Sequence, residues 1–237
     1  ERCGSRGARP MTSAARPRPT AVSTLVLVPG AGGSAWYWHR LVPELDARGH
    51  RAVPVELPAA DDSAGLQEYA ETVVEAARDL RDVVLVAQSF AGRSAPLVCA
   101  RRPVRGLILL NAMIPRPGET PGEWWENTGH AQARLAQARA AGRSEDSLAD
   151  LADAFFHDVP PEITAEAFAQ GEPVQSATPL ATPWPLRAWP DVPLQVLHGR
   201  DDRFFPLEFA ERVAAERLGS PVQAIAGGHL VALSRPA

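Results

Sequence analysis

The sequence contains no lysine, since all 24 of its basic residues are arginine. This absence excludes chemistry that needs a lysine side chain, such as Schiff-base formation or the lysine of a Walker phosphate-binding loop. The only two cysteines, Cys3 and Cys99, form neither a CxxC pair nor a disulfide framework, so a reducing, cytoplasmic compartment is predicted. No apolar run approaches the roughly 18 residues of a membrane span, and no membrane association is expected.

The sequence also lacks a strong excess of either positive or negative charge: its formal net charge is only -4. A weakly acidic chain has no general attraction to nucleic acid or to anionic lipid, so a small-molecule partner is predicted rather than a polyanion. No metal-binding cluster and no cofactor requirement are evident, and neither is predicted. With 237 residues and 45% hydrophobic content, the chain is long enough to bury a sizeable core as one domain.

The chain begins with a segment of unusual composition. Residues 1–20 are rich in Arg, Pro, Ser and Gly without a periodic apolar face, which predicts a disordered tail. A cleaved secretion signal is disfavoured, because cleavage after the following apolar run would remove a core strand.

Short apolar runs alternate with helical patterns along the rest of the chain. The runs are residues 24–29, 51–56, 83–87, 104–111, 193–198 and 222–226, and the helical patterns are 35–48, 65–80, 90–102 and 206–218. This alternation predicts an α/β fold with a mostly parallel sheet of about six strands, flanked by helices. Residues 21–114 and 188–237 form the predicted core, and residues 115–187 a helical lid insertion over the carboxyl ends of the strands.

The stretch Ala87-Gln88-Ser89-Phe90-Ala91 follows a buried strand and opens a helix. It has the small-x-Ser-x-small spacing of a nucleophile elbow, in which the serine occupies a strained turn and the small flanking residues let strand and helix approach. The alternative is that Ser89 only caps the helix, since serine is a common N-cap residue.

Two later loops carry the side chains that would activate such a serine. Asp201 and Asp202 follow the run 193–198, and His229 follows the run 222–226 in a glycine turn. Both loops fall at the carboxyl ends of predicted parallel strands, where ligands bind in α/β sheets. The chain order Ser, Asp, His is the order of an α/β-hydrolase triad.

With these three motifs in this order, the sequence resembles the α/β-hydrolase superfamily over residues 24–237, and in particular the compact branch of plant-type methyl esterases, hydroxynitrile lyases and small bacterial esterases. The resemblance implies Asp202 rather than Asp201 as the acid, through a Gly-x-x-Asp-x-x-x-Pro pattern, and His229 as the base, through a Gly-Gly-His turn. It also implies the backbone N–H groups of Phe90 and Ala31 as the oxyanion hole.

The glycine turn after the first strand has a competing interpretation. Gly30, Gly32 and Ala35 satisfy the G-x-G-x-x-[GA] pattern of dinucleotide-binding folds, and Glu56 ends the next strand where a ribose-binding acid would lie. That interpretation leaves the three later motifs unexplained. Proline stands at position 29, where the resembling family usually has histidine.

The resulting functional prediction is a serine hydrolase that cleaves a small, fairly apolar carboxylic ester through an acyl-enzyme intermediate. Its catalytic residues are Ser89, Asp202 and His229, and Gly30, Trp124 and Trp125 are predicted to bind substrate. The two tryptophans could instead belong to the core of the lid. His198 is predicted to be a buried, hydrogen-bonded core histidine, and Arg93 has no role that the sequence explains.

Two alternatives remain open. A hydroxynitrile lyase would use the same triad, but its plant members use a lid lysine that this chain lacks. A ligand-binding or scaffold protein with slow hydrolysis belongs to a different class. The segment after His229 is also short, so an open sheet face is expected, and the chain is predicted to be a monomer or a possible homodimer.

Overall fold

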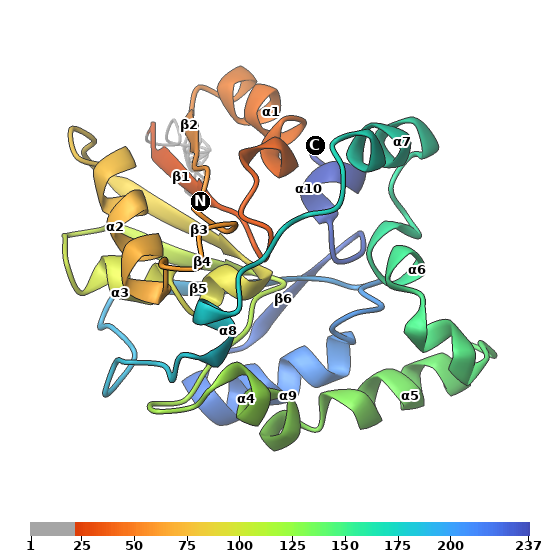
Figure 1. The fold of residues 1–237 in the computed structure, drawn as a ribbon. Helices are drawn as coiled ribbons and strands as arrows, with labels where there is room; N and C mark the ends of the chain where they lie inside the picture. Colours follow the sequence, from red (N-terminus) through yellow and green to blue (C-terminus); the bar gives the residue numbers. More distant parts are fainter. Residues whose placement is uncertain (1–21) are drawn as a thin grey trace, which may run out of the picture.

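A computed structural model of the chain describes residues 22–237, so the predicted tail of residues 1–20 lies outside the described part. The centre is a six-stranded, entirely parallel sheet with the strand order β2-β1-β3-β4-β5-β6 (Figure 1). The strands are β1 (Thr24–Val28), β2 (Arg51–Pro54), β3 (Val83–Gln88), β4 (Gly106–Leu110), β5 (Leu194–Gly199) and β6 (Val222–Ile225). This sheet confirms the predicted α/β class and the predicted strands.

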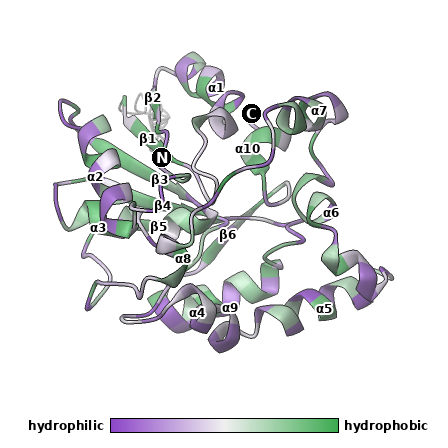
Figure 2. Cartoon of the chain, in the orientation of Figure 1, coloured by the Kyte–Doolittle hydropathy of each residue, from purple (hydrophilic) through white to green (hydrophobic). Residues whose placement is uncertain are grey.

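Alternation of side chains along the strands divides the core into two clusters. In β3, Leu85 and Ala87 belong to one cluster and Val86 to the other, as expected for a pleated strand with period two. Both clusters are apolar, because a parallel sheet is covered on both faces. Figure 2 shows this pattern, with hydrophobic colour on the strands and hydrophilic colour on the outer sides of the helices.

Helices from different parts of the chain cover the two faces. Three helices pack on the first face: α2 (Leu66–Ala76), α3 (Ala95–Cys99) and α9 (Leu207–Leu218). The second face is covered by the 3-10 helix Ala35–Trp38, α1 (Leu41–Ala47) and α10 (Val231–Ser234). Every helix within residues 22–237 is too short or too polar to span a bilayer.

Two predicted helices are divided in the structure. The pattern over 35–48 becomes a 3-10 helix followed by α1, and the pattern over 90–102 becomes the 3-10 helix Ser89–Gly92 followed by α3. Each second piece carries a proline near its start, Pro43 in α1 and Pro96 in α3. Proline has no backbone N–H with which to continue a helix from the preceding turn, but it fits the first turn of a new one.

The segment between β4 and β5 forms a helical layer at the carboxyl ends of the strands. We call residues 115–187 the cap. It contains α4 (Pro121–Thr128), α5 (His130–Ala140), the 3-10 helix Glu145–Ala149, α6 (Leu151–Phe156), α7 (Pro161–Ala169) and α8 (Thr178–Ala181). In Figure 1, α4 and α5 run along the lower side of the molecule and α6 and α7 along its right-hand side, while α8 lies near the middle.

The two ends of the cap are held together at one place. The N–H of Gly118 donates to the carbonyl of Trp184, and the N–H of Trp184 donates to the carbonyl of Glu119, both at 2.9 Å. Arg93 is fully buried and donates to the carbonyls of Glu119 at 2.8 Å and Thr182 at 3.0 Å. The structure thus gives Arg93 a role that the sequence did not reveal: it fastens both ends of the cap to the segment after Ser89.

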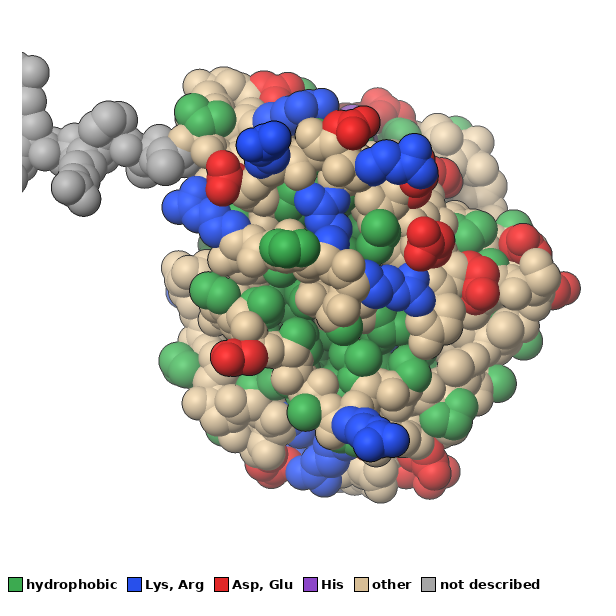
Figure 3. All heavy atoms as spheres, turned by 90° about the vertical axis from the view of Figure 1, so that its left-hand side faces the viewer, with side chains coloured by type: hydrophobic (Ala, Val, Ile, Leu, Met, Phe, Trp, Pro, Cys, Tyr) green, Lys and Arg blue, Asp and Glu red, His purple; other side chains and the backbone are tan. Residues whose placement is uncertain are grey.

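An apolar groove lies on the second face of the sheet. Its volume is about 250 Å³. Figure 3 shows hydrophobic side chains gathered in a hollow on one side of the molecule, with arginine side chains nearby. Whether two copies associate stays a prediction. The groove is lined mainly by aliphatic side chains, including Leu25, Leu41, Val86, Ile108, Leu197 and Ile225.

Candidate active site

Ser89 occupies a strained turn between β3 and the following 3-10 helix. Its backbone has a φ of 51°, in the left-handed region that non-glycine residues rarely adopt. The carbon atoms around it are close: a Cβ at Gly30 would lie 2.9 Å from the Ser89 Cβ, and Ala87 and Ala91 are both buried. The predicted elbow geometry is therefore present, and the small residues around it are required by space.

The three predicted catalytic residues meet above the carboxyl ends of the strands. The Nε2 atom of His229 lies 3.0 Å from the Oγ of Ser89. The Nδ1–H of His229 donates to Oδ2 of Asp202 at 2.8 Å. Asp202 is 0% exposed and His229 1% exposed, while Ser89 is only partly buried. The hydroxyl is thus the accessible end of a buried hydrogen-bonded chain.

The carboxylate of Asp202 is held in its ionised form. Burial alone would raise its pKa, but the charge and hydrogen bond of His229, the nearby His198 and the backbone N–H of Phe205 together lower the pKa below its ordinary value. Oδ1 accepts the N–H groups of Phe204 and Phe205, both at 2.8 Å, which leaves Oδ2 for the imidazole. Both carboxylate oxygens therefore have fixed partners.

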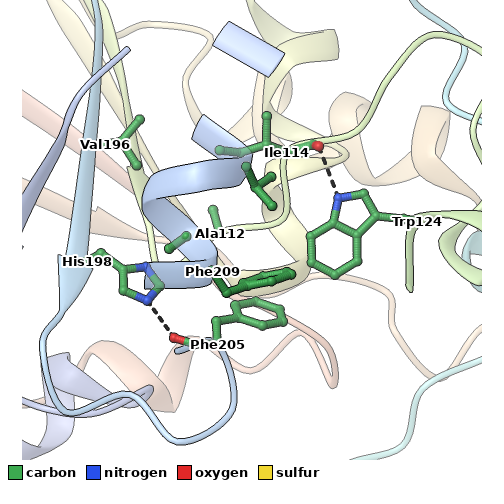
Figure 4. A pocket seen from close by; sticks show the side chains of 9 residues that line it. Ala112, Ile114, Trp124, Val196, His198, Phe205 and Phe209 are labelled. Carbon is green, nitrogen blue, oxygen red and sulfur yellow. Dashed lines mark hydrogen bonds between the residues drawn. The ribbon is translucent and has the colours of Figure 1, made fainter. Parts of the chain in front are cut away.

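His198 is a buried core histidine, as predicted, and lies beside the site. Its Nε2–H donates to the carbonyl of Phe205 at 2.8 Å, and burial lowers its pKa below the ordinary value. Figure 4 shows this bond at the edge of a small apolar cavity of about 10 Å³. A space of that size holds at most about one water molecule, so this cavity does not accommodate a substrate.

The glycine turn after β1 packs against Ser89. The N–H of Gly33 donates to the carbonyl of Gly30 at 3.1 Å, and Gly32 has a φ of 83°, which a side chain would disfavour at this turn position. Glu56 accepts the N–H of Ala35 at 2.6 Å. The acid of the dinucleotide interpretation is thus engaged by the turn itself, while Ala31 next to Gly30 is exposed.

The cap reaches the acid loop and the base loop of this site. In the acid loop, Gln137 of α5 donates to the carbonyl of Asp202 at 2.8 Å. In the base loop, Asp158 accepts the N–H of Gly228 at 2.7 Å. Both loops that carry the buried members of the triad are therefore fixed to the cap.

A third cap contact falls on the glycine turn. The N–H of Gly32 donates to Oε1 of Gln175 at 3.0 Å. A Cβ at Gly32 would lie 2.6 Å from Pro173, so the cap segment here rests directly on the turn. The cap therefore contacts the glycine turn as well as the acid and base loops.

Three phenylalanine rings surround the imidazole of His229. Phe155 of the cap lies 5.1 Å from it, Phe204 also 5.1 Å, and Phe205 5.0 Å, each measured between ring centroids in an edge-on arrangement. Sequence reasoning missed these residues. The adjacent pairs Phe155-Phe156 and Phe204-Phe205 were the only local signal, and a pair of phenylalanines is common in any core.

The two predicted substrate-binding tryptophans are placed differently. Trp124 is 1% exposed, and its indole N–H donates to the carbonyl of Ile114 at 3.0 Å (Figure 4). This placement favours the alternative that Trp124 belongs to the core below the cap. Trp125 is partly buried, and its ring lies 5.8 Å from that of Phe204, one of the three rings around His229.

The buried His130 is expected to make the protein less stable at acidic pH. Burial lowers its pKa to about 4 from 6.5, against the opposing effect of its bond to the carbonyl of Phe204. The unfolded chain takes up a proton on His130 below about pH 6.5, whereas the folded chain does so only near pH 4. The free energy of unfolding therefore falls as the pH drops from 6.5 to 4. We expect a loss of about 2 kcal/mol between pH 7 and pH 5 from this group.

Urea denaturation of the wild type and His130→Gln at both pH values measures this loss. Glutamine retains a donor for the Phe204 carbonyl but does not titrate, so the variant should lose less stability on acidification. His39→Gln, outside the cap and partly exposed, serves as the control and should behave as the wild type does. An equal pH dependence in wild type and His130→Gln would contradict the assignment.

Comparison with known proteins decides the family. The family model described as "Alpha/beta hydrolase family" matches residues 25–237. The chain belongs to the alpha/beta hydrolase family. The fold described above, with a parallel sheet flanked by helices, is shared by solved members of this family. Within residues 22–237, no group of three or more His, Cys, Asp or Glu side chains is placed to hold a metal ion.

Individual members of the alpha/beta hydrolase family resemble parts of the chain. A probable esterase from Oryza sativa subsp. indica is 35% identical over 109 residues, which are 41% of this chain and 41% of that protein. This match spans less than half of the rice protein. A pyrethroid hydrolase from Sphingobium wenxiniae is 28% identical over 218 residues, covering 82% of this chain and 76% of that protein.

The solved structures extend the likeness of fold to nearly the whole chain. The crystal structure of polyneuridine aldehyde esterase superposes with a TM-score of 0.72 at 21% identity, covering 91% of this chain and 95% of that one. At this identity the likeness concerns the fold.

Proposed function

We propose that this alpha/beta hydrolase is a serine hydrolase of small, fairly apolar carboxylic esters, acting through an acyl-enzyme. The observation that carries the proposal is the continuous chain of contacts from the Ser89 hydroxyl through His229 to Asp202, at 3.0 and 2.8 Å. The names of the related esterases support the same reaction class. The strained backbone of Ser89 adds support, because strain of this kind gathers at functional sites.

The acylation step follows from this geometry. The Ser89 oxygen attacks the ester carbonyl carbon while Nε2 of His229 takes the hydroxyl proton. The tetrahedral intermediate then collapses: the bond to the alcohol oxygen breaks, and His229 returns the proton to that oxygen. Asp202 holds the imidazole in the tautomer that presents a bare Nε2 to Ser89 and stabilises the imidazolium.

Deacylation repeats the same steps with water as the nucleophile. His229 takes a proton from water, the water oxygen bonds to the acyl carbon, and the bond to Ser89 breaks as its oxygen regains a proton. The acid leaves and the free enzyme is restored, with no electron transfer and no cofactor in the sequence of steps.

Charge on the carbonyl oxygen needs fixed donors during both steps. We assign this task to the backbone N–H groups of Phe90 and Ala31. The close packing of Gly30 on Ser89 supports the assignment, since it brings the following residue to the side of the nucleophile. Loss of one such donor costs about 3 kcal/mol in comparable enzymes.

The surroundings of His229 favour an uncharged substrate. The rings of Phe155 and Phe204 line the partly buried region beside the imidazole, and Trp125 lies beyond Phe204. Burying an ionised group against such rings without a partner is costly, whereas apolar acyl or alcohol groups gain by transfer from water. Gly30 and Trp125 remain proposed contacts of the substrate.

Labelling with a fluorophosphonate tests the proposal. Intact-mass analysis of the wild type should show one adduct, while Ser89→Ala and His229→Ala should show none, because the reagent needs an activated serine. Ser94→Ala is the matched control: Ser94 is buried five residues further along and should label like the wild type. Well-folded wild-type protein that takes up no adduct would overturn the proposal in favour of a binding protein.

A further inference from the structure

Asn111 lies at the centre of the sheet edge on which the site is built. It follows β4, which is hydrogen-bonded to β3 on one side and to β5 on the other. Ser89 follows β3 and the loop of Asp202 follows β5, so Asn111 stands between the two. It is 0% exposed, and its φ of 46° is one of three left-handed values among the non-glycine residues of the described chain. A buried polar side chain on a strained backbone calls for a physical reason.

The side chain of Asn111 joins the acid loop to the base loop. Its Oδ1 accepts the N–H of Gly199 at 2.7 Å, and Gly199 in turn accepts the N–H of Asp202. Its Nδ2 donates to the carbonyls of Gly228 at 2.9 Å and His229 at 2.8 Å. One amide group therefore fixes the start of the acid loop and the backbone of the base residue.

The backbone after Asn111 reaches the third loop. The N–H of Met113 donates to the carbonyl of Ser89 at 2.9 Å. The left-handed turn at Asn111 directs the chain toward this contact while its side chain faces the other two loops. Residues 111–113 thus touch all three loops that carry the triad, from the one strand that stands between them.

We propose that Asn111 is a positioning residue, which sets the distance between the acid and base loops and so aligns His229 between Asp202 and Ser89. The inference rests on the proposed function, because the alignment matters only if His229 transfers protons. Asn111 is suited to the task in two ways. Its amide supplies both a donor and an acceptor at one point, and asparagine tolerates the left-handed conformation better than most residues.

Two substitutions separate the side chain from the backbone. Asn111→Gly keeps the left-handed turn and removes all three side-chain bonds. Asn111→Asp keeps an acceptor for Gly199 but turns an oxygen toward the carbonyls of Gly228 and His229, which repel it. Asn127→Ala is the control, because Asn127 is an exposed asparagine of α4 whose side chain bonds only Glu119 among the described hydrogen bonds.

The expected result is a loss in kcat with little change in KM. Displacement of a catalytic group by about 1 Å costs about 100-fold, so we expect kcat and the fluorophosphonate labelling rate to fall about 30- to 100-fold in both variants. KM for a p-nitrophenyl ester should stay within about twofold, since Asn111 does not line the substrate region. Asn127→Ala should label at the wild-type rate.

A spectroscopic measurement keeps the inference testable without turnover. The Nδ1 proton of His229, held by Asp202, should give a far-downfield proton NMR signal in the wild type, and this signal should broaden or vanish in Asn111→Gly. Folded Asn111→Gly that labels within twofold of the wild type and retains the signal would overturn the positioning role. Wild-type protein that shows the signal but takes no label would instead overturn the proposed function alone.

Discussion

Asp202→Asn is expected to lower kcat/KM for ester hydrolysis by about 10⁴-fold while leaving the protein folded. The reason lies in the two N–H groups of Phe204 and Phe205 that point at Oδ1. They will hold the amide oxygen of asparagine, so the NH₂ group must face His229. The imidazole then accepts at Nδ1, carries its proton on Nε2, and cannot take the proton of Ser89.

Asp201→Asn is the matched control for this experiment. Asp201 is the neighbouring, exposed carboxylate, and within residues 22–237 its Oδ2 accepts one long bond, of 3.3 Å, from the N–H of Gly227. We expect its kcat/KM to stay within about threefold of the wild type, because this single long hydrogen bond contributes little and Asp201 does not contact His229 or Ser89 among the described hydrogen bonds. Steady-state kinetics on a soluble ester, with circular dichroism to check folding, measures both variants. Comparable losses in the two would show that the assignment to Asp202 is wrong.

Gly92→Ala is expected to have the largest effect on stability. A Cβ at Gly92 would lie 2.0 Å from the carbonyl oxygen of Met113, and this atom belongs to the backbone. The segment cannot move aside without losing the bond between Met113 and the Ser89 carbonyl. We expect a loss of at least about 3 kcal/mol, which lowers the melting temperature of a chain of this size by about 10 °C.

Gly122→Ala adds the same methyl group where space is open. The nearest atom to a Cβ at Gly122, in helix α4, is the Thr120 hydroxyl at 4.0 Å. Alanine is the better helix former, so this variant should match the wild type or gain up to about 1 kcal/mol. Thermal melts of the two variants decide the matter. A melting temperature of Gly92→Ala within 2 °C of that of Gly122→Ala would contradict the packing described here.

The sequence predicted those parts of the site that are encoded locally. Ser89 and His229 each stand in a short motif whose spacing has a steric reason, and the Gly-x-x-Asp-x-x-x-Pro pattern of the resembled family selected Asp202 over Asp201. The strands could also be predicted from the sequence, because buried parallel strands are continuous apolar runs. His198 was predicted to be buried because it ends such a run.

The remaining parts depend on contacts between distant segments. Arg93 acquires its role only when both ends of the cap meet it, and Asn111 only when two later loops fold beside it. Phe155 reaches His229 across more than seventy residues of sequence, whereas Trp124, which looked equally suited to bind substrate, packs inward. No local pattern distinguishes these outcomes, since they are set by how the cap settles on the core.

The pairing of Trp184 with Gly118 and Glu119 makes the cap a side branch of the chain that leaves and rejoins the core at one point. The free-energy cost of closing such a loop, which is entropic, rises only by about 0.6 kcal/mol for each doubling of the loop length. The branch can therefore be lengthened or shortened at little entropic cost to the core. A replacement cap introduced by engineering must again provide hydrogen-bond acceptors for the N–H groups of Gly32 and Gly228. Gln175 and Asp158 provide them in this protein.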